Sequence, residues 1–579
     1  MNSQLIISGN RQNSSVAELS ETSTNQFIFS TKPIQIIKQF LMSNQKYLSQ
    51  ECQEIGPQTN LERQESSFQI RQEAAQIAFG RGVYQHICNG EEQDYKGENG
   101  FPNFIANFSK GLPHNYLGEV DPNAYYALLT ALKSGKQEDF ETIPLGGLRK
   151  FTNPQAGLAF DLEGPDSHAL AIRPAPRIDS AENSAEMAEL YWMALLRDIN
   201  FTLFNRSSQV AEAAADLSKF SDYRAAKVER QTKDGIICEV SPEILFRGIY
   251  PGDLIGPYVS QFLLKDIPYG SLTISQKQKT VMPGVNYMTD YDSWLHVQNG
   301  GLTGSDAFDA TPRYMRNLRD LAQYVHVDAL YEAYLNACLI LLGMNAPVDE
   351  GNPYKRSQTQ IGFGTFGGPH ILSLVTEVAT RALKAVWFQK WFVHRRLRPE
   401  EFGGRVHNHL TGRANYPINQ ELFHSCVLEK VYSRYGNYLL PIAFPEGSPT
   451  HPAYGSGHAT VAGGCVTILK AWFDESWVIP NPVVPNDSGT ELVGYSGNDA
   501  GMITVGGELN KVASNIATAR NGAGVHWRTD YTESVKLGED VAIGILQEQA
   551  LTYNEEHFFT LTKLDGTKIK ISREGVEQI

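Results

Sequence analysis

The chain is poor in cysteine, in long apolar runs and in positive charge, and each shortage excludes a class of protein. Its six cysteines are scattered over 579 residues with no CxxC pair or other metal-ligand spacing, so no cysteine-bound metal site is predicted. The best apolar window, residues 329–344, carries Glu332 and is too short to cross a bilayer. Asp and Glu number 64 against 50 Lys and Arg, and the net charge of −14 disfavours binding to nucleic acid or to an anionic membrane.

The amino-terminal residues lack the basic and apolar stretches of a secretory signal. We therefore expect a soluble protein and slightly favour the cytoplasm, although the compartment stays open. Cys52 and Cys88 lie in polar surroundings and could pair within one chain or between two. Cys338 and Cys465 lie in apolar helical patterns that predict burial.

Apolar residues recur with helical spacing along most of the chain, while strand patterns are rare. The clearest strand pattern, residues 558–572, flanks the turn Leu564-Asp565-Gly566 and predicts a hairpin. The sequence therefore predicts a mainly α fold of large helical bundles with a few short strands. The helical runs are residues 125–134, 181–204, 208–220, 315–343, 370–396, 457–473, 508–520 and 531–552.

Composition and periodicity divide the chain into four expected parts. Residues 1–60 form a polar amino-terminal extension with one amphipathic piece at 34–48, and residues 61–350 form the helical first half of the core. Residues 351–552 form the helical half that carries the catalytic motifs described next, and residues 553–579 form a C-terminal hairpin tail.

Positive charge concentrates in one basic run, residues 390–405 (KWFVHRRLRPEEFGGR). Pro399 forces the residue before it out of helical geometry, so Arg398 lies on an exit turn from which it can reach back toward Lys390. An isolated run of this kind is more often a solvated helix end whose charge complements the helix dipole.

A second segment, residues 451–458 (HPAYGSGH), opens an apolar helix. Free amides at a helix amino terminus bind anions, Gly457 lets an oxyanion approach the backbone, and Ser456 adds a hydroxyl donor. Taken alone, Ser456 is more often an ordinary helix cap. His458, in the first turn, is a candidate proton donor and acceptor.

A third segment, residues 520–530 (RNGAGVHWRTD), combines a cation, an imidazole and a carboxylate. Arg520 ends a helix, and His526 follows two glycines. Asp530 lies about one helical turn beyond His526, so its carboxylate can accept a hydrogen bond from the imidazole and fix the tautomer. In isolation these would be a surface arginine and a core or capping histidine.

Together the three segments supply what a highly charged tetrahedral oxyanion requires. Lys390, Arg398 and Arg520 are three cations, and Ser456 and the Gly457 amide are neutral donors. Arginine offers forked donors to two oxygens, lysine a compact positive charge, and the helix amino terminus completes the cage. An acidic chain would not gather these groups by accident. An anion-binding site therefore explains the three segments together better than a solvated helix end, a helix cap and a surface arginine explain them one by one.

The ordered motifs K-x7-RP (390–399), SGH (456–458) and R-x3-G-x-H-x3-D (520–530) resemble those of the vanadium-dependent haloperoxidases. That superfamily includes the type-2 phosphatidic acid phosphatases, because vanadate and phosphate are tetrahedral anions of similar shape. The bromoperoxidases of red algae and cyanobacteria are the more similar branch. The Lys-to-Arg spacing is one residue longer than in the phosphatases, Gly455 and Ala519 replace their usual Pro and Ser, and His451 lies in the setting GSPTHPAYGSGH.

The resemblance implies how a vanadate cofactor would be held. His526 would bind vanadium through a ring nitrogen, and Asp530 would orient the ring from behind. Vanadium would stay in the +5 state and act as a Lewis acid. The vanadate oxygens would be held by Lys390, Arg398, Ser456, Gly457 and Arg520.

The resemblance also implies catalytic roles. His458 would take a proton from hydrogen peroxide and return one later, and Lys390 would polarise the peroxide. His451 is a candidate second acid–base or halide-site residue, with a structural histidine as the alternative. Trp387, three residues before Lys390, could line the halide pocket or belong to the core.

The implied activity is oxidation of bromide and iodide by hydrogen peroxide to a hypohalous-acid equivalent that halogenates small organic acceptors. Chloride stays an open alternative, because pocket electrostatics decide between the halides. No nucleic acid or membrane partner is expected, and the family implies a homo-oligomer of dimers built into a dodecamer. Two other functions remain open, an acid phosphatase inhibited by vanadate and a non-enzymatic oxyanion-binding assembly protein.

Calcium is a doubtful second cofactor. Red-algal members of the family contain a structural calcium site ahead of the long helix. The equivalent stretch, residues 351–363, holds no carboxylate, and calcium prefers several charged oxygen ligands. We therefore expect no strong calcium site there.

Overall fold

The structure, a computed structural model, describes residues 56–97, 100–232 and 235–579. The chain forms two compact units, Met1–Ser67 and Phe68–Ile579. In the first unit the described residues begin helix α2 (Asn60–Arg81), and Thr59 and Glu62 cap its amino end with reciprocal hydrogen bonds. The piece predicted at 34–48 and Cys52 lie outside the described residues.

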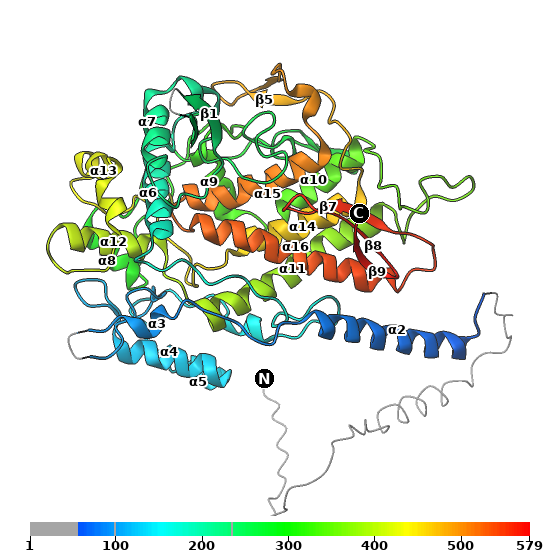
Figure 1. The fold of residues 1–579 in the computed structure, drawn as a ribbon, viewed down its shortest axis with the longest axis horizontal. Helices are drawn as coiled ribbons and strands as arrows, with labels where there is room; N and C mark the ends of the chain where they lie inside the picture. The colour runs from blue at the N-terminus through cyan, green and yellow to red at the C-terminus, as the bar shows by residue number, and fades with distance from the viewer. Residues whose placement is uncertain (1–55, 98–99, 233–234) are drawn as a thin grey trace, which may run out of the picture. The chain divides into compact units, whose positions relative to one another are not determined.

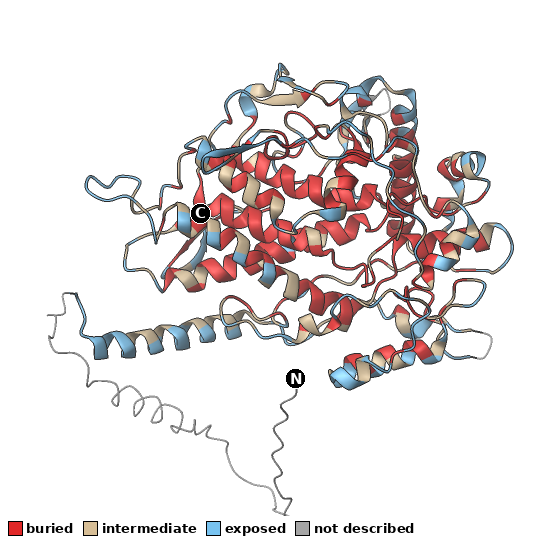
Figure 2. Ribbon diagram, turned by 180° about the vertical axis from the view of Figure 1, so that it is seen from behind, coloured by how far each residue is buried: buried red, intermediate tan, exposed pale blue. Residues whose placement is uncertain are grey.

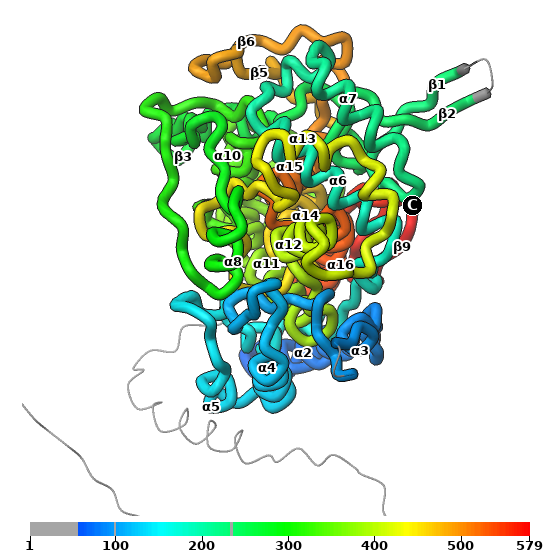
Figure 3. The backbone as a smooth tube through the Cα atoms, turned by 90° about the vertical axis from the view of Figure 1, so that its left-hand side faces the viewer, coloured from blue at the N-terminus to red at the C-terminus, as the bar shows by residue number. Residues whose placement is uncertain are grey.

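Helix α14 (Gly457–Trp472) is the centre of the second unit. It packs against α11 (Gly368–Phe388), α15 (Val505–Gly522) and α16 (Arg528–Ala550), and Figures 1 and 3 show these helices grouped around it. All of its residues except His458 are buried, as the red ribbons at the centre of Figure 2 illustrate. A helix that is apolar on all sides is stable only inside such a bundle.

Glycines bring the backbones of α14 and α16 into contact. A Cβ atom at Gly463 would lie 1.9 Å from the carbonyl oxygen of Val535, and one at Gly538 would lie 1.9 Å from that of Thr460. At this close approach the backbone amide of Ser456, just before α14, donates to Ser534 Oγ on α16 over 2.8 Å. The amino termini of the two helices are therefore fixed side by side.

Smaller elements surround this bundle. The helices are α3 (Glu91–Asp94), α4 (Pro122–Ser134), α5 (Gln137–Phe140), α6 (Ala181–Leu196), α7 (Ser208–Leu217), α8 (Tyr291–Gln298), α9 (Leu318–Val327), α10 (Glu332–Gly343), α12 (Pro399–Leu410) and α13 (Val427–Tyr435). The strands pair antiparallel as β1–β2 (Val228–Thr232, Gly235–Glu239), β3–β4 (Ile267–Tyr269, Leu272–Ile274), β5–β6 (Val483–Pro485, Leu492–Gly494) and β7–β8–β9 (Phe559–Thr562, Lys568–Ser572, Gly575–Gln578).

The mainly helical fold is confirmed, and so are the burial of Cys338 and Cys465 and the C-terminal hairpin, to which β9 adds a third strand. The predicted bounds of two long helices are wrong. The run at 181–204 ends as α6 at Leu196, and the run at 315–343 is two helices, α9 and α10, with a bend of 101° between them. Apolar spacing continues through both breaks, so periodicity alone does not reveal them.

The domain boundaries expected at residues 60, 350 and 552 stay predictions. Among the described residues no single helix is long and apolar enough to cross a membrane, and only the bent pair α9 and α10 meets that standard of length and composition together.

The glycine contact between α14 and α16 predicts a position-specific loss of stability. Gly538→Ala would force a methyl group against the Thr460 carbonyl, and we expect it to lower the free energy of unfolding by about 1–3 kcal/mol. Urea denaturation measures this directly. Gly368→Ala is the matched control, because no atom lies within 4 Å of a Cβ at that position, and a loss of equal size there would contradict the packing argument.

Candidate active site

Lys390 lies on an irregular turn and not on the regular helix that the sequence predicted. Helix α11 ends at Phe388, and Gln389–His394 continue it as a π-helical turn, a feature that often marks functional positions. Arg395 then adopts a left-handed conformation with φ at 42°, and the chain reverses.

Arg398 is the residue just before α12 and turns back toward Lys390, as we predicted from the position of Pro399. The two cations approach the same ring nitrogen, Nδ1 of His451. Lys390 Nζ lies 2.9 Å from it and Arg398 Nη2 lies 2.8 Å from it. The Pro452 carbonyl oxygen also lies 3.3 Å from Nδ1, but the two donors are closer, so Nδ1 carries the lone pair and the proton of His451 is on Nε2.

Arg398 also joins the loop before α16 to this point. Its Nε donates to the carbonyl oxygen of His451 over 2.9 Å, and its Nη1 donates to that of Val525 over 2.7 Å. The same Nη1 lies 3.0 Å from Nε2 of His526. Three distant segments therefore meet at the guanidinium group of Arg398. They are residues 390–405, 451–458 and 520–530.

Arg520, on α15, is the third cation. Its Nη1 donates to the Val325 carbonyl oxygen over 2.7 Å, and its guanidinium lies 5.4 Å from the ring centre of Phe444. Its Nε is buried and has no partner among the described residues. A buried N–H without an acceptor is costly, and an anion beside it would remove that cost.

No carboxylate of the described residues lies within 4.0 Å of the charged groups of Lys390, Arg398 or Arg520. Burial, and next the charge of Arg398, lowers the pKa of Lys390 well below its usual value. Burial likewise lowers the pKa of Arg398 to about 9 and that of Arg520 to about 10. Among the described residues, three cationic side chains are thus buried near one another with no carboxylate in contact, and an anion beside them would favour their charged forms.

His526 presents a lone pair to this cationic group. Its Nδ1 lies 2.8 Å from Asp530 Oδ2, and because a carboxylate only accepts, Nδ1 carries the proton. Burial, and then the charges of Arg398 and Lys390, lower the pKa of His526 well below its usual value. The imidazole is therefore neutral, and its Nε2 lone pair faces Arg398 Nη1, the donor that lies 3.0 Å from it.

Asp530 is itself held in place from the opposite side. Its Oδ1 accepts from Arg396 Nη1 over 3.1 Å, and Arg396 Nη2 donates to Glu186 over 2.8 Å. Glu186 in turn accepts from the backbone and hydroxyl of Thr529. The orientation of His526 thus rests on a buried chain of charges that reaches helix α6.

Ser456 and Gly457 form the amino terminus of α14. Ser456 Oγ accepts from the amide of Ala459 over 3.4 Å, the capping contact that the sequence suggested. A Cβ at Gly457 would lie 3.0 Å from the ring of Trp387, so a larger residue there would require the indole to shift by a few tenths of an ångström. Lys390 Nζ lies 4.8 Å from the same ring centre, and the Trp387 and His451 ring centres are 4.8 Å apart. The indole therefore packs between the helix terminus and the cations.

His458 is the one predicted site residue that is partly exposed, with 18% of its side chain accessible. Its Nε2 lies 3.0 Å from Asp328 Oδ1. Burial would raise the pKa of Asp328, but His458 lowers it below its usual value, so the carboxylate is charged and Nε2 of His458 carries the proton. Nδ1 of His458 is then the atom available to accept a proton.

Only two of the five cations in the basic run reach the pocket. Arg395 pairs with Glu92 over 2.7 Å, Arg396 pairs with Glu186 and Asp530, and Arg405 donates to the carbonyl oxygens of Leu117 and Gly118.

The sequence did not predict that Asp328 contacts His458, or that Arg396 holds Asp530 in place. Asp328 lies in the break between α9 and α10, inside the run that periodicity presented as one helix. Its only sequence signal is a carboxylate at the end of a helix, which is common. Arg396 was hidden among its neighbours, because its partners on α6 lie more than 200 residues away.

The donor set fits a tetrahedral oxyanion bound beside one imidazole. It contains three unpaired cations, an orphan Nε on Arg520 and the lone pair of His526 Nε2. Among residues 56–97, 100–232 and 235–579 no group of three or more His, Cys, Asp or Glu side chains could hold a metal ion. The three cations could balance the negative charge of such an anion.

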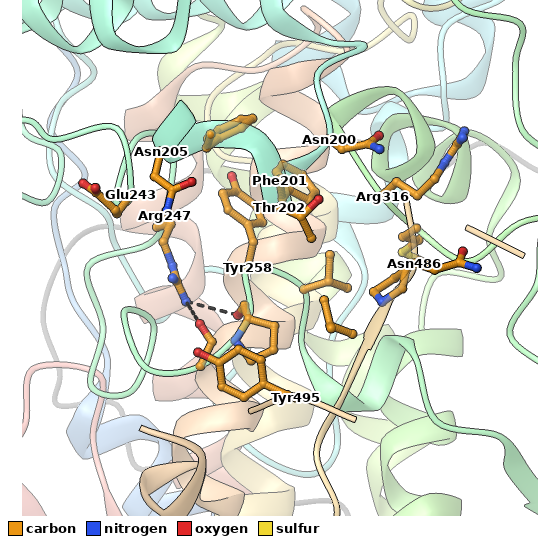
Figure 4. A pocket seen from close by; sticks show the side chains of 17 residues that line it. Asn200, Phe201, Thr202, Asn205, Glu243, Arg247, Tyr258, Arg316, Asn486 and Tyr495 are labelled. Atoms are coloured by element: carbon orange, nitrogen blue, oxygen red, sulfur yellow. Dashed lines mark hydrogen bonds between the residues drawn. The ribbon is translucent and has the colours of Figure 1, made fainter. Parts of the chain in front are cut away.

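A separate apolar pocket of about 330 Å³ is shown in Figure 4. Phe201 and Tyr258, stacked 3.7 Å apart, form one wall, and Tyr495 lies opposite. One of its two arginines, Arg247, is engaged by backbone carbonyl oxygens, among them those of Gly256 and Pro257. None of the site residues above lines this pocket.

Comparison with known proteins gives consistent matches. The family described as the VCPO second helical-bundle domain matches residues 373–554. The chain is 41% identical to a vanadium-dependent bromoperoxidase of Corallina officinalis, over 89% of this chain and 100% of that protein, and 35% identical to one of Ascophyllum nodosum, over 89% and 93%. The homohexameric structure of the second vanadate-dependent bromoperoxidase of A. nodosum superimposes with a TM-score of 0.85 at 31% identity, covering 93% of this chain and 96% of that one.

The unpaired cations predict that a tetrahedral oxyanion stabilises the protein. Orthophosphate at 100 times its Kd should raise the free energy of unfolding by about 2.7 kcal/mol, visible as a higher Tm. Arg398→Met should abolish the anion-dependent rise, whereas Arg356→Met, at a residue with an 82% exposed side chain, should retain it. A phosphate response that survives in Arg398→Met would contradict the assignment of the site.

Proposed function

This chain belongs to the family of vanadium-dependent bromoperoxidases, and from that premise we propose that its pocket of three cations holds vanadate. The protein is a vanadate-dependent haloperoxidase that uses hydrogen peroxide to oxidise bromide to a hypohalous-acid equivalent, which halogenates organic substrates. The observation that carries the proposal is the meeting of Lys390 and Arg398 at His451 Nδ1, with Arg398 also 3.0 Å from His526 Nε2. The charge of Arg520 also lowers the pKa of His526, and among the described residues no carboxylate lies within 4.0 Å of the three cations.

Each group of the pocket would hold vanadate in a way that its chemistry allows. His526 Nε2 would bind vanadium, since Asp530 fixes the proton on Nδ1. Bound vanadate supplies a Lewis acid that activates hydrogen peroxide toward halide. Its negatively charged oxygens would be held by Lys390, Arg398, Arg520, the Ser456 hydroxyl and the Gly457 amide.

The two remaining histidines, His458 and His451, would have different roles in proton transfer. His458 Nδ1 would accept a proton from incoming peroxide and return it later, while Asp328 holds the proton on Nε2. His451 has the opposite tautomer, with Nε2–H available as a donor and Nδ1 fixed by Lys390 and Arg398. Trp387, packed against His451 and Lys390, would line the halide pocket and exclude water from it.

The protein forms a homo-oligomer, as its homohexameric relative supports. The dodecamer implied by the sequence resemblance is the finer proposal. For calcium, we keep the expectation that residues 351–363 bind none strongly, and metal analysis after dialysis against calcium tests it.

The function is tested by reconstitution. Apoprotein should gain bromination that depends on both peroxide and bromide when orthovanadate is added. If vanadate instead only inhibits hydrolysis of a phosphate ester, the protein is a phosphatase. If vanadate binds and neither reaction occurs, it is an oxyanion-binding protein.

Substitution of the proposed ligand should separate binding from turnover. His526→Ala removes the proposed nitrogen ligand of vanadium, so vanadium should be lost on gel filtration, as measured by elemental analysis. Lys390→Ala leaves His526 in place and should mainly lower kcat. Wild-type halogenation by His526→Ala at the same vanadate concentration would refute the ligand assignment.

Asp328 should act through His458. Its charge raises the pKa of His458, which burial lowers, so Asp328→Asn should lower that pKa further. A base with a lower pKa stays unprotonated at lower pH, and the acidic limb of the kcat profile should therefore move to lower pH, with kcat reduced at least tenfold. His458→Ala should lose turnover and still retain vanadate.

The control for this prediction is Asp306→Asn, which removes a carboxylate 3.4 Å from His326, a histidine to which the proposal gives no role. An acidic limb that stays in place in Asp328→Asn, or moves equally in the control, would contradict the role of Asp328.

A further inference from the structure

A buried cluster of alternating charges adjoins the ring of His526. It consists of Asp530, Arg396 and Glu186, whose side chains are 0%, 2% and 4% exposed. Arg396 donates to both carboxylates, to Asp530 Oδ1 over 3.1 Å and to Glu186 Oε2 over 2.8 Å. Two carboxylates therefore share one guanidinium group, and the cluster as a whole carries a net negative charge.

Glu186 is a charged member of this cluster. Its Oε1 accepts from both the amide and the hydroxyl of Thr529, and its Oε2 accepts from Arg396. Burial raises the pKa of Glu186, and the charge of Arg396 is the next largest effect and lowers it. Hydrogen-bond donors face both oxygens, and such donors stabilise the ionised form of a carboxyl group.

Arg396 is held at a fixed distance from the imidazole. Its Nη2 also donates to Asn183 Oδ1 over 2.9 Å, and its guanidinium lies 4.5 Å from the ring centre of Trp527. Trp527 directly follows His526, and its amide donates to Asp530 Oδ2 over 3.0 Å. The loop that carries His526 therefore also fixes the position of the cluster, so its charge acts on the pocket from a constant place.

The cations of the pocket respond to the charge of this cluster. Asp530 pairs with His526 and Arg396 and with neither Lys390 nor Arg398. Burial is the largest effect on the pKa of both cations and lowers it, whereas the charge of Asp530 acts to raise both. A carboxylate that favours the charged form of a cation also repels an anion beside that cation. Between buried groups such forces are weakly screened and extend beyond contact distance.

We propose that Glu186 and Arg396 set the affinity of the pocket for its oxyanion, with Arg396 raising that affinity and Glu186 lowering it. The proposal rests on the proposed function and deepens it, because it names two residues that tune the anion site through Asp530. Arg396 offsets the charge of Asp530, which would otherwise oppose the anion more strongly. Glu186 pairs with the same guanidinium group and so leaves more of the Asp530 charge uncompensated.

The experiment measures the Kd of orthovanadate for the full-length protein freed of bound anion, by equilibrium dialysis and elemental analysis of vanadium. Arg396→Met should raise Kd and Glu186→Gln should lower it, each by at least about threefold, because each removes one buried charge near the site. The double variant Arg396→Met/Glu186→Gln removes one charge of each sign, so its Kd should return toward the wild-type value. Arg396→Lys keeps the charge and should restore most of the affinity that Arg396→Met loses.

A merely structural role of the cluster predicts a different pattern. Lost packing or lost hydrogen bonds would weaken binding in both single variants, and further in the double variant. Glu508→Gln is the matched control, because Glu508 is as buried as Glu186 and pairs with Lys511 on α15. It lies twelve residues before Arg520, about 18 Å along the helix, so its loss should leave Kd unchanged.

Three results would overturn the proposal: a Kd that rises or stays unchanged in Glu186→Gln, a double variant that binds more weakly than Arg396→Met, or an equal shift in Glu508→Gln. Glu186→Gln alone gives the decisive sign, so the test stands even if Arg396→Met does not fold. Bromination by the same samples reports on the proposed function separately. A wild-type protein that binds vanadate without brominating counts against the function alone, and one that binds no vanadate overturns both.

Discussion

Three buried cationic side chains, with no carboxylate in contact among the residues that the structure describes, are the constraint on which this structure depends. Burying one uncompensated charge costs several kcal/mol, and Lys390, Arg398 and Arg520 converge on one pocket. The fold accommodates them because rigid elements hold them there: a π-helical turn for Lys390, a proline-directed reversal for Arg398 and the core helix α15 for Arg520. An oxyanion relieves the mutual repulsion of these cations, so binding and stability are linked through the same charges.

The surrounding carboxylates are arranged so that they leave this charge in place. Asp530 is close to the pocket, but its second oxygen is engaged by Arg396, which is in turn paired with Glu186. Asp328 is engaged by His458. The acidic residues therefore set the tautomers of the two histidines and do not neutralise the cations, which keeps the affinity for an anion in an otherwise acidic chain.

Much of the site could be predicted from the sequence, because its chemistry lies in short local patterns. The spacing of Lys390, Arg398 and Pro399, the helix start at Ser456 and the separation of His526 from Asp530 are all set by local backbone geometry. The π-helical turn and the break between α9 and α10 could not be predicted, because apolar spacing continues through both. The roles of Asp328 and Glu186 could not be predicted either, because their partners are brought close only by the packing of distant helices.

The central claim is that the cations surround an oxyanion whose metal is bound to His526. A crystal structure of the protein soaked with orthovanadate tests it most directly. The account predicts one strong anomalous peak within bonding distance of His526 Nε2, with its oxygens facing Lys390, Arg398 and Arg520. A pocket that stays empty at saturating vanadate, or a peak at another position, would contradict it.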